Sequence, residues 1–338
     1  MILPAAPPAF KPPRGIYQDK NTDSARFLRW KIPLQDAIIA GREKIRCAVR
    51  LGGAAAEGVM LYLILAICCN AMISIVMRVS KIYTQNQMPM LAMNYVTCCL
   101  LAALYAGPGQ LLPVQTAGFG TALWVGALSG LLYLTSFVLL HWNIRQNGIV
   151  LPATFMRLGV LVPAVLAVVL FRETPGLRQL IGFAGALAAI GLLHFDSASG
   201  PAKNRWGLIA LLLAGGFTDV MAKVYAYYGQ AALKNQYLVY TFLTALLLCT
   251  ALIFAKRQRL GKWEVLFGIL IGVPNYISSR FLLLSLDSVP AVVAYPTYSV
   301  GAIVLISLAG FAVFHERFTR RRLAALGVIL ISLVLLNL

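Results

Sequence analysis

The sequence predicts an all-α membrane protein of ten transmembrane helices, arranged as two inverted five-helix repeats. Three observations predict this fold class. Of the 338 residues, 60% are hydrophobic and 12% are charged, and the mean hydropathy is +0.79, which is more apolar surface than a water-soluble domain can bury. Apolar runs of about 20 residues, long enough to cross roughly 30 Å of hydrocarbon, recur along the chain. Finally, one long segment occurs twice.

The apolar runs define ten spans, which short polar or basic segments separate. The first five lie near 60–80, 89–107, 117–142, 147–171 and 175–195. After the polar link Asp196 to Arg205, the second five lie near 206–229, 236–255, 263–286, 288–314 and 318–338. Five prolines within or next to spans are expected to interrupt or kink them: Pro152, Pro163, Pro274, Pro290 and Pro296. The chain therefore divides into a basic segment (1–59), a first repeat (60–195) and a second repeat (206–338).

The repeat is clearest between residues 126–172 and 268–315. Phe171-Arg172-Glu173 returns 143 positions later as Phe314-His315-Glu316. Further pairs have the same spacing or one residue less: Thr154 with Thr297, Gly126 with Gly268, and Gly130 with Gly272. Because each repeat has an odd number of spans, the second enters the membrane from the opposite side. A two-fold axis in the membrane plane would then relate the repeats, and a shared cavity between them would open alternately to either side.

Residues 1–59 are basic and contain neither a span-length apolar run nor a signal-peptide core. Two interpretations stay open. The physiological start is Met60 and the upstream stretch is a mis-assigned extension, or the stretch is a disordered basic tail that contacts anionic lipids. The orientation is open as well: Lys and Arg in the loops place both ends of the bundle outside the cytoplasm, whereas the basic segment favours the inside.

The twice-occurring motif also resembles a known family. An apolar run that ends in Phe-x-Glu leads through a short basic link into a helix with Gly182, Gly185 and Gly191, and in the second copy into a helix with Gly327. Over roughly residues 60–338 this pattern resembles the drug/metabolite transporter (DMT) superfamily, EamA-like family. The resemblance implies a five-plus-five inverted repeat, a cavity lined by helices 1, 3, 4, 6, 8 and 9, and transport of small metabolites or drugs, often export.

One departure from the superfamily concerns the first helix. Its small multidrug resistance members carry an essential Glu there, whereas this chain offers Asn70, Ser74 and Arg78 and no acid. The departure argues against exchange of cationic drugs for protons.

Several residues of the motif are expected to be structural. Glu173 and Glu316 lie at junctions between spans, where a carboxylate would cap the start of the next helix. Gly182, Gly185 and Ala189 are expected to allow close packing of helices. The six cysteines show no Cys-x-x-Cys spacing and no His partner, so no metal site is predicted.

Four ionisable residues lie well inside spans: Arg157, Asp219, Lys223 and Arg280. A charge there costs roughly 2.5–3.5 kcal/mol and tends to face a cavity or a partner. Arg157 and Arg280 are predicted to bind substrate, because an arginine offers paired donors to a carboxylate or phosphate; the alternative is that each pairs with Asp219 or a backbone carbonyl, or extends to the interface. Asp219, with Lys223, is the candidate for proton coupling, and the alternative is a satisfied salt bridge between these two residues one turn apart.

Polar and aromatic residues at similar depth are predicted to complete the binding site: Tyr133, Asn275, Tyr276 and Tyr298, with Tyr295 as a further candidate. They would supply hydrogen bonds and stacking, although a buried tyrosine often packs with its hydroxyl satisfied.

The predicted function is a secondary transporter of a small metabolite, preferably polar, anionic or zwitterionic, that exports by alternating access in the plasma or inner membrane. The alternatives are a lipid-carrier or lipid flippase and a proton-coupled multidrug exporter. No catalytic motif is present, so neither an enzyme nor a cofactor is expected. The basic residues flank spans, so nucleic acid is not expected as a partner. Expected partners are a small-molecule substrate, the bilayer and the proton as coupling ion, for a monomer or homodimer.

Overall fold

The computed structural model describes residues 54–84, 86–107, 109–147, 150–194, 204–313 and 320–337. All described residues belong to one compact unit, Leu51–Leu338. That unit contains both predicted repeats. The predictions for residues 1–53 and for Glu316 lie outside the described residues.

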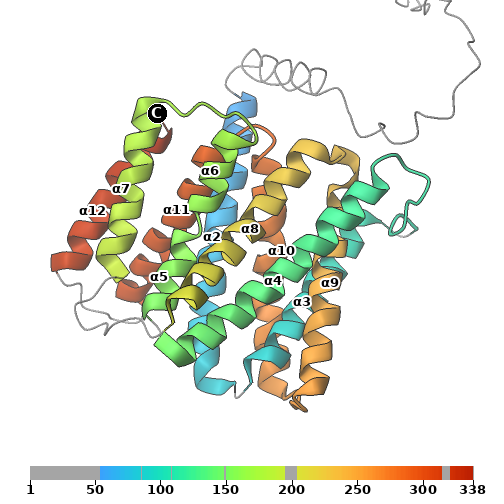
Figure 1. Ribbon diagram of the computed structural model, residues 1–338. Helices are drawn as coiled ribbons and strands as arrows, with labels where there is room; N and C mark the ends of the chain where they lie inside the picture. The colour runs from blue at the N-terminus through green and yellow to red at the C-terminus, as the bar shows by residue number, and fades with distance from the viewer. Residues whose placement is uncertain are drawn as a thin grey trace, which may run out of the picture. The chain divides into compact units, whose positions relative to one another are not determined.

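Every regular element in these ranges is helical (Figure 1). The first half contains α2 (Ala54–Tyr83), α3 (Gln87–Ala106), α4 (Phe119–Asn147), α5 (Val150–Leu158), α6 (Leu161–Val169) and α7 (Leu177–His194). The second half contains α8 (Arg205–Tyr228), the 3₁₀ turn η1 (Ala231–Leu233), α9 (Lys234–Ala255), α10 (Lys262–Ser285), α11 (Ala291–Ala312) and α12 (Arg320–Asn337). Each predicted span has a helical counterpart whose ends lie within a few residues of the prediction, apart from the first, which begins earlier.

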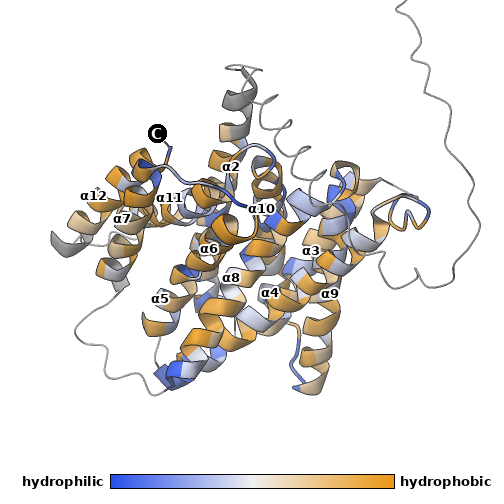
Figure 2. Ribbon diagram, turned by 45° about the horizontal axis from the view of Figure 1, so that its top comes forward, coloured by the Kyte–Doolittle hydropathy of each residue, from blue (hydrophilic) through white to orange (hydrophobic). Residues whose placement is uncertain are grey.

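Eight helical segments of the described chain are long and apolar enough to cross a membrane, with α5 and α6 counted as one segment. Two shorter apolar helices, Leu177–Leu192 and Leu323–Asn337, lie in α7 and α12. In Figure 2 hydrophobic residues cover most of the helical surface, and hydrophilic residues gather near helix ends and in connecting loops. Because lipid is the solvent that suits such a surface, the chain is a membrane protein.

The fourth predicted span is broken into α5 and α6 at Gly159 and Val160. Gly159 lies against the backbone of α8, where an added Cβ would be 3.3 Å from the Leu212 carbonyl oxygen. The expected interruption is confirmed at Pro163, which lies four residues after Gly159 and cannot donate to its carbonyl oxygen. Pro274 and Pro296, in contrast, lie inside continuous helices. Neighbouring helices in a bundle can accommodate the hydrogen bond that such a proline removes.

The helices interlock across the two halves of the chain. α10 packs against α2 and α3, and α4 packs against α8 and α9. α3 also contacts α9, and α7 pairs with α12 at one side of the bundle (Figure 1). α11 contacts α2, α6 and α12, while α5 and α6 contact α8. Neither half therefore forms a separate bundle, because each half supplies the helices that bury the other.

Glycines allow two of these contacts to be close. A Cβ added to Gly126 would lie 2.9 Å from the Tyr237 carbonyl oxygen of α9. In the second half, a Cβ added to Gly268 would lie 2.8 Å from the Met90 carbonyl oxygen of α3. The backbones approach closely at these positions because the helix presents no side chain there.

The expected close packing of the fifth span is confirmed. A Cβ added to Gly182 would lie 2.9 Å from the Ser332 carbonyl oxygen, and one added to Gly185 would lie 2.5 Å from the Ser332 hydroxyl. Ala189 is buried on the same helix. Small residues on α7 thus form the contact surface for α12.

Candidate functional site

A small cavity lies among four helices that come from both halves of the chain. Its lining consists of Ser129 and Tyr133 of α4, Thr218, Asp219 and Ala222 of α8, Tyr237, Leu238, Thr241 and Phe242 of α9, and Ser279, Leu282 and Leu283 of α10. Its volume is about 30 Å³. That space holds one or two water molecules, whereas a small-molecule site has about 300–1,000 Å³. The helices in this structure therefore pack too closely around the cavity to admit a small-molecule ligand.

Polar residues reach the cavity in pairs that are four positions apart. Ser129 and Tyr133 share one face of α4, and Tyr237 and Thr241 share one face of α9. The Ser129 and Tyr237 hydroxyls are 3.3 Å apart, and the Thr241 hydroxyl donates to the Tyr237 carbonyl oxygen at 2.8 Å. The wall between α4 and α9 is therefore lined with hydroxyl groups.

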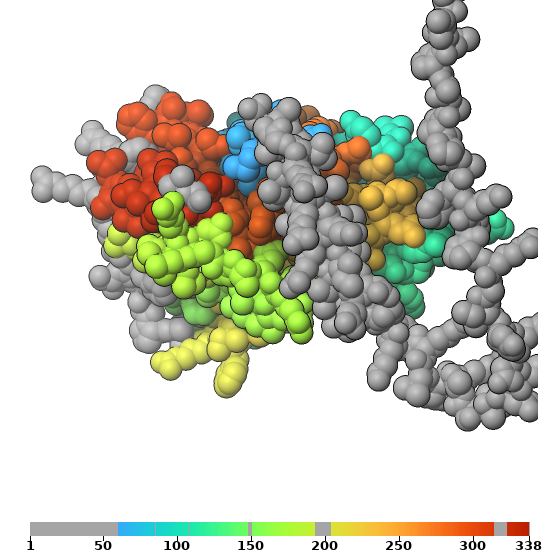
Figure 3. All heavy atoms as spheres, turned by 90° about the horizontal axis from the view of Figure 1, so that it is seen from above, coloured from blue at the N-terminus to red at the C-terminus, as the bar shows by residue number. Residues whose placement is uncertain are grey.

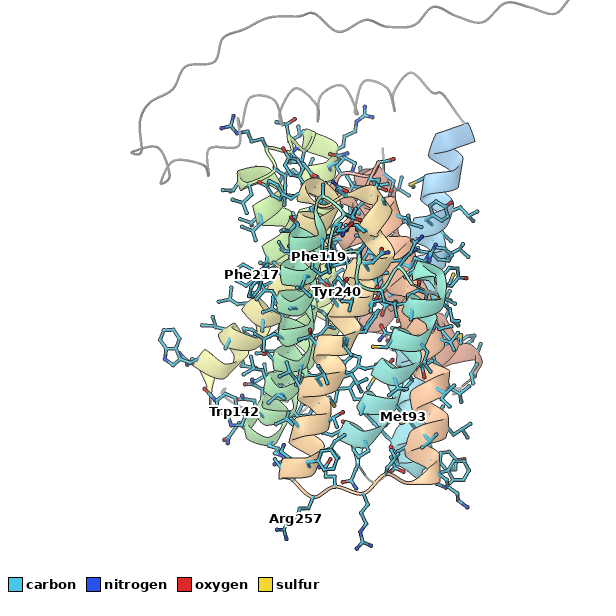
Figure 4. The ribbon with its side chains drawn as sticks, turned by 90° about the vertical axis from the view of Figure 1, so that its right-hand side faces the viewer. Met93, Phe119, Trp142, Phe217, Tyr240 and Arg257 are labelled. Carbon is cyan, nitrogen blue, oxygen red and sulfur yellow. The ribbon has the colours of Figure 1, made fainter. Side chains whose placement is uncertain are left out.

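Figure 4 shows this wall from the side and labels residues near its ends. Phe119 at the start of α4 lies beside Tyr240 of α9, with ring centroids 6.1 Å apart. Trp142 and Arg257 lie toward the opposite end of the same two helices. The cavity residues of α9, 237–242, are thus nearer the end at which α4 begins.

Asp219 and Arg157 bring opposite charges to this part of the bundle. Asp219 lines the cavity from α8, and Arg157 is the last charged residue of α5. The two side chains interact electrostatically with each other and with Tyr298 of α11. Both are half-buried, and neither makes a hydrogen bond or ion pair through its side chain with any residue in the described ranges. Two opposite, unsatisfied charges can bind the charged groups of a ligand.

Tyrosines surround these two charges. The Tyr295 hydroxyl donates to the Asp219 carbonyl oxygen and so ties α11 to α8. Tyr298 is hydrogen-bonded to Ser278, with 3.0 Å between their hydroxyl oxygens. Tyr133 interacts electrostatically with both Asp219 and Tyr298. The structure thus brings Tyr133, Arg157, Asp219 and Tyr298 close enough to interact electrostatically.

The expected salt bridge between Asp219 and Lys223 is wrong. Lys223 Nζ lies 2.8 Å from Glu173 Oε1, at the junction of α6 and α7. The spacing of four residues places Asp219 and Lys223 on one face of α8, but a long lysine side chain can reach a partner on a neighbouring helix.

The expected capping role of Glu173 needs correction. Its carboxylate accepts hydrogen bonds from the Ala291 and Val292 backbone amides at 3.0 and 2.9 Å. It therefore caps α11, a helix 118 residues away in sequence, and not the following helix α7. Pro290, the N-cap residue of α11, provides no side-chain cap. An acid from elsewhere in the fold satisfies the first amides instead.

Arg280 lies in a separate cluster with Tyr276. Its guanidinium donates to the Asn235 side-chain oxygen and to the Tyr276 hydroxyl, each at 3.0 Å. It also lies over the Tyr105 ring, 4.1 Å from the centroid. These contacts satisfy Arg280 without Asp219, by partners that the sequence did not indicate.

Asn275 also points away from the cavity lining. Its amide donates to the Asn94 side-chain oxygen at 3.1 Å, in the contact between α10 and α3. Asn275, Tyr276 and Arg280 thus join helices to one another, while Ser279 of the same helix reaches the cavity.

The cavity helices differ from those that the family resemblance implied. α9, the seventh span, contributes four lining residues, yet it was absent from the expected set. Sequence reasoning therefore missed Ser129, Thr218, Tyr237, Thr241, Phe242 and Ser279. One signal was available: hydroxyl residues recur at a spacing of four in two apolar spans, which places them on one helix face.

No cluster of metal-ligating residues occurs in the part of the chain that the structure describes. Two cysteines of the spans, Cys98 and Cys249, are fully buried. Their thiols donate to the carbonyl oxygens of Gly272 and Met88 across helix contacts. These two cysteines therefore pack between helices.

Comparisons with known proteins agree with this architecture. Residues 236–329 match the family described as Small Multidrug Resistance protein. An uncharacterized protein from Haemophilus influenzae is 24% identical over 277 residues, which cover 79% of this chain and 93% of that protein. One solved crystal structure is similar with a TM-score of 0.65 at 13% identity, over 83% of this chain and 98% of that chain. The chain is thus a membrane protein with the fold of that structure, and its second half is similar to small multidrug resistance proteins.

Proposed function

We propose that the protein is a secondary transporter of a small polar metabolite, anionic or zwitterionic, that it exports by alternating access. One observation carries the proposal. Asp219 lines a small cavity rich in hydroxyl groups and interacts electrostatically with Arg157, and neither side chain makes a hydrogen bond or an ion pair among the described residues. A charge inside a membrane protein costs roughly 2.5–3.5 kcal/mol, so an unsatisfied pair suits a ligand that completes it.

The helix contacts support two inverted five-helix repeats, as in the EamA-like family. In the two halves, α2 is equivalent to α8, α3 to α9, α4 to α10 and α7 to α12, and α5 with α6 is equivalent to α11. The α2–α10 contact therefore has an equivalent in the α8–α4 contact, and the α3–α10 contact has one in the α9–α4 contact. The α3–α9, α6–α11 and α7–α12 contacts each join a helix to its own equivalent. This pattern supports a two-fold relation between the halves, which in many transporters allows alternating access.

The closed cavity fits one stage of such a cycle. With space for only one or two waters, it is too small for a metabolite until helices separate. Rocking of the two sets of interlocked helices would enlarge it toward one side of the membrane or the other. We place the protein in the cell membrane, the plasma or inner membrane, with the proton as candidate coupling ion.

The proposal is tested first by ligand binding. Purified protein is screened against anionic, zwitterionic and cationic metabolites by thermal unfolding, because a ligand that binds the folded state raises the unfolding temperature. Asp219→Asn and Arg157→Gln should each abolish the shift given by a zwitterion, while Arg178→Gln should retain it. Arg178 is a suitable control because it is an exposed arginine at the start of α7.

Transport is then measured in proteoliposomes with the ligand so identified. The parent and Arg178→Gln should exchange labelled ligand across the bilayer, and the two site variants should not. If Asp219→Asn and Arg157→Gln transport at the parent's rate, the assignment of the site is wrong. If neither the parent nor any variant transports a ligand that it binds, the transporter proposal fails.

A second candidate, a proton-coupled drug exporter, is favoured by the match of residues 236–329 to small multidrug resistance proteins. The two candidates differ in the charge of the substrate. Arg157 would repel a lipophilic cation, whereas Asp219 would bind it. The second candidate is correct if an imposed pH gradient drives transport of lipophilic cations in exchange for protons, and if Arg157→Gln accelerates this transport.

A further inference from the structure

Glu173 joins three parts of the fold at one end of the bundle. Its carboxylate belongs to the α6–α7 junction of the first half. It binds Lys223 of α8 and the first two amides of α11, both from the second half. Figure 3 looks onto this end, where lime residues of the first half lie next to orange residues of the second. A movement that separates α6 and α7 from α8 and α11 must break these contacts.

Lys223 follows the part of α8 that lines the cavity, toward the end of that helix. Lys223 directly follows Ala222, which lines the cavity, and it is one turn from Asp219. The side chains of Lys223 and Glu173 are only 12% and 14% exposed, so water and salt screen the pair weakly. The Phe171 ring lies 5.7 Å from Lys223 Nζ and covers it further. The pair therefore joins the two halves beyond the cavity-lining part of α8.

Lys223 has two carboxylates within reach of its position on α8, and the structure pairs it with one of them. Glu173 would keep its two amide donors if Lys223 left, so it would not become an unsatisfied buried acid. The Asp219 side chain makes no hydrogen bond or ion pair among the described residues, and it would gain an ion pair if Lys223 turned toward it. The other groups that interact electrostatically with Asp219 are Arg157, Tyr133, Tyr295 and Tyr298.

We propose that Lys223 exchanges between Glu173 and Asp219, and that this exchange couples the occupant of Asp219 to closure of the bundle at the end where α11 begins. With Lys223 on Glu173, the end is closed and Asp219 is left for the cargo. When the cargo has gone, Asp219 attracts Lys223, the contact with Glu173 breaks, and this end opens. The inference rests on the proposed function, because it requires a cargo that binds at Asp219.

The test measures opening directly and does not depend on transport. Ser279→Cys places a thiol in the cavity lining. Its reaction with a membrane-impermeant thiol reagent is followed in vesicles of both orientations, and the reaction of the protein without the added cysteine is subtracted. Glu173→Gln and Lys223→Gln are then introduced separately. Glu173→Gln retains an amide oxygen that can accept from α11, so it removes the charge without abolishing the cap.

The matched control is Lys234→Gln. Lys234 pairs with Asp287 near the same end, but both residues belong to the second half, so their contact does not join the halves. We expect Glu173→Gln and Lys223→Gln to label at least fivefold faster than the parent from one side of the membrane, and Lys234→Gln to label at the parent's rate. Asp219→Asn, which removes the second acceptor, should label no faster than the parent.

Two results would overturn the inference. One is that the folded Glu173→Gln and Lys223→Gln proteins label at the parent's rate from both sides, in which case the pair does not close the cavity. The other is that Asp219→Asn opens the cavity as Lys223→Gln does, in which case Lys223 does not exchange between the acids. Folding is checked by size-exclusion chromatography, and Lys223→Arg, which retains the charge, should restore slow labelling. If the Glu173 and Lys223 variants label faster as expected but the parent transports no ligand, the proposed function fails while the inferred closure by this pair stands.

Discussion

Gly130→Ala adds a methyl group where α4 and α9 are in direct contact. An added Cβ would lie 2.3 Å from the Thr241 carbonyl oxygen and 2.8 Å from the Thr244 Cβ. The nearer atom belongs to the backbone of α9, so no side-chain rotation can relieve the overlap. The two helices would have to separate by roughly 1 Å to restore an ordinary contact, at the wall that lines the cavity.

Two opposing terms set the expected magnitude. Alanine is a better helix former than glycine by about 1 kcal/mol, which favours the variant. Overpacking a well-packed contact typically costs about 1–3 kcal/mol, and the backbone overlap places Gly130 at the upper end of that range. We therefore expect a net loss of about 1–2 kcal/mol in the free energy of unfolding.

The assay is thermal and denaturant unfolding of the purified protein in detergent, with Gly215→Ala as control. Gly215 lies inside α8, and an added Cβ would have no neighbour within 4 Å. The same substitution there should gain up to about 1 kcal/mol from helix propensity alone. The unfolding temperature should therefore rank Gly130→Ala below the parent and Gly215→Ala at or above it.

The reasoning is refuted if Gly130→Ala unfolds at the temperature of Gly215→Ala. The equivalent glycine of the second half supplies a further comparison. A Cβ added to Gly272 would lie 2.5 Å from the Thr97 Cβ and 2.9 Å from the Asn94 carbonyl oxygen. If the halves are built alike, Gly272→Ala should lose stability as Gly130→Ala does.

The remaining predictions concern polar contacts between helices, and all use the same unfolding assay. Asn143 is fully buried and donates to the Gly207 carbonyl oxygen at 2.9 Å, so Asn143→Leu should cost about 1 kcal/mol; an unchanged unfolding temperature would contradict this. Tyr295→Phe removes the donor to the Asp219 carbonyl oxygen and should cost about 0.5–1.5 kcal/mol, whereas a gain in stability would argue against that bond. Arg280→Gln should destabilise the protein by about 1–3 kcal/mol, because it loses two hydrogen bonds and a cation–π contact. Ligand binding should persist in this variant. If the variant loses binding but not stability, Arg280 contacts the ligand.

Much of the fold could be predicted because the bilayer constrains the backbone of each span independently of the others. Each span must satisfy its own backbone hydrogen bonds and present apolar side chains to lipid, so a run of sufficient length is already a helix. The predicted ends of the second span, 89–107, and of the seventh, 236–255, agree closely with α3 and α9 for this reason. The break at Gly159 and Val160 lies four residues before Pro163, one of the prolines expected to interrupt the spans, and a proline cannot donate the hydrogen bond that the Gly159 carbonyl oxygen would accept in a continuous helix.

The candidate site could be predicted only in part. Arg157 and Asp219 could be identified because a charge inside an apolar run is costly wherever the span lies in the bundle. Arg280 satisfies the same criterion, yet Tyr276, Asn235 and Tyr105 hold it away from the cavity lining. Whether a charge meets a partner or an empty space depends on which helix faces it, and that information is not local.

The sequence by itself determined that the protein lies in a membrane and where its helices lie, because these depend on composition and on the length of the apolar runs. Only the tertiary structure decided which polar side chains pair with which groups. Glu173 caps α11 and binds Lys223, while Asp219 lines the cavity and does not pair with Lys223, although the two are one helical turn apart. The physical reason is that a side chain several ångströms long can reach any adjacent helix, and the packing of the whole bundle determines which helix is adjacent.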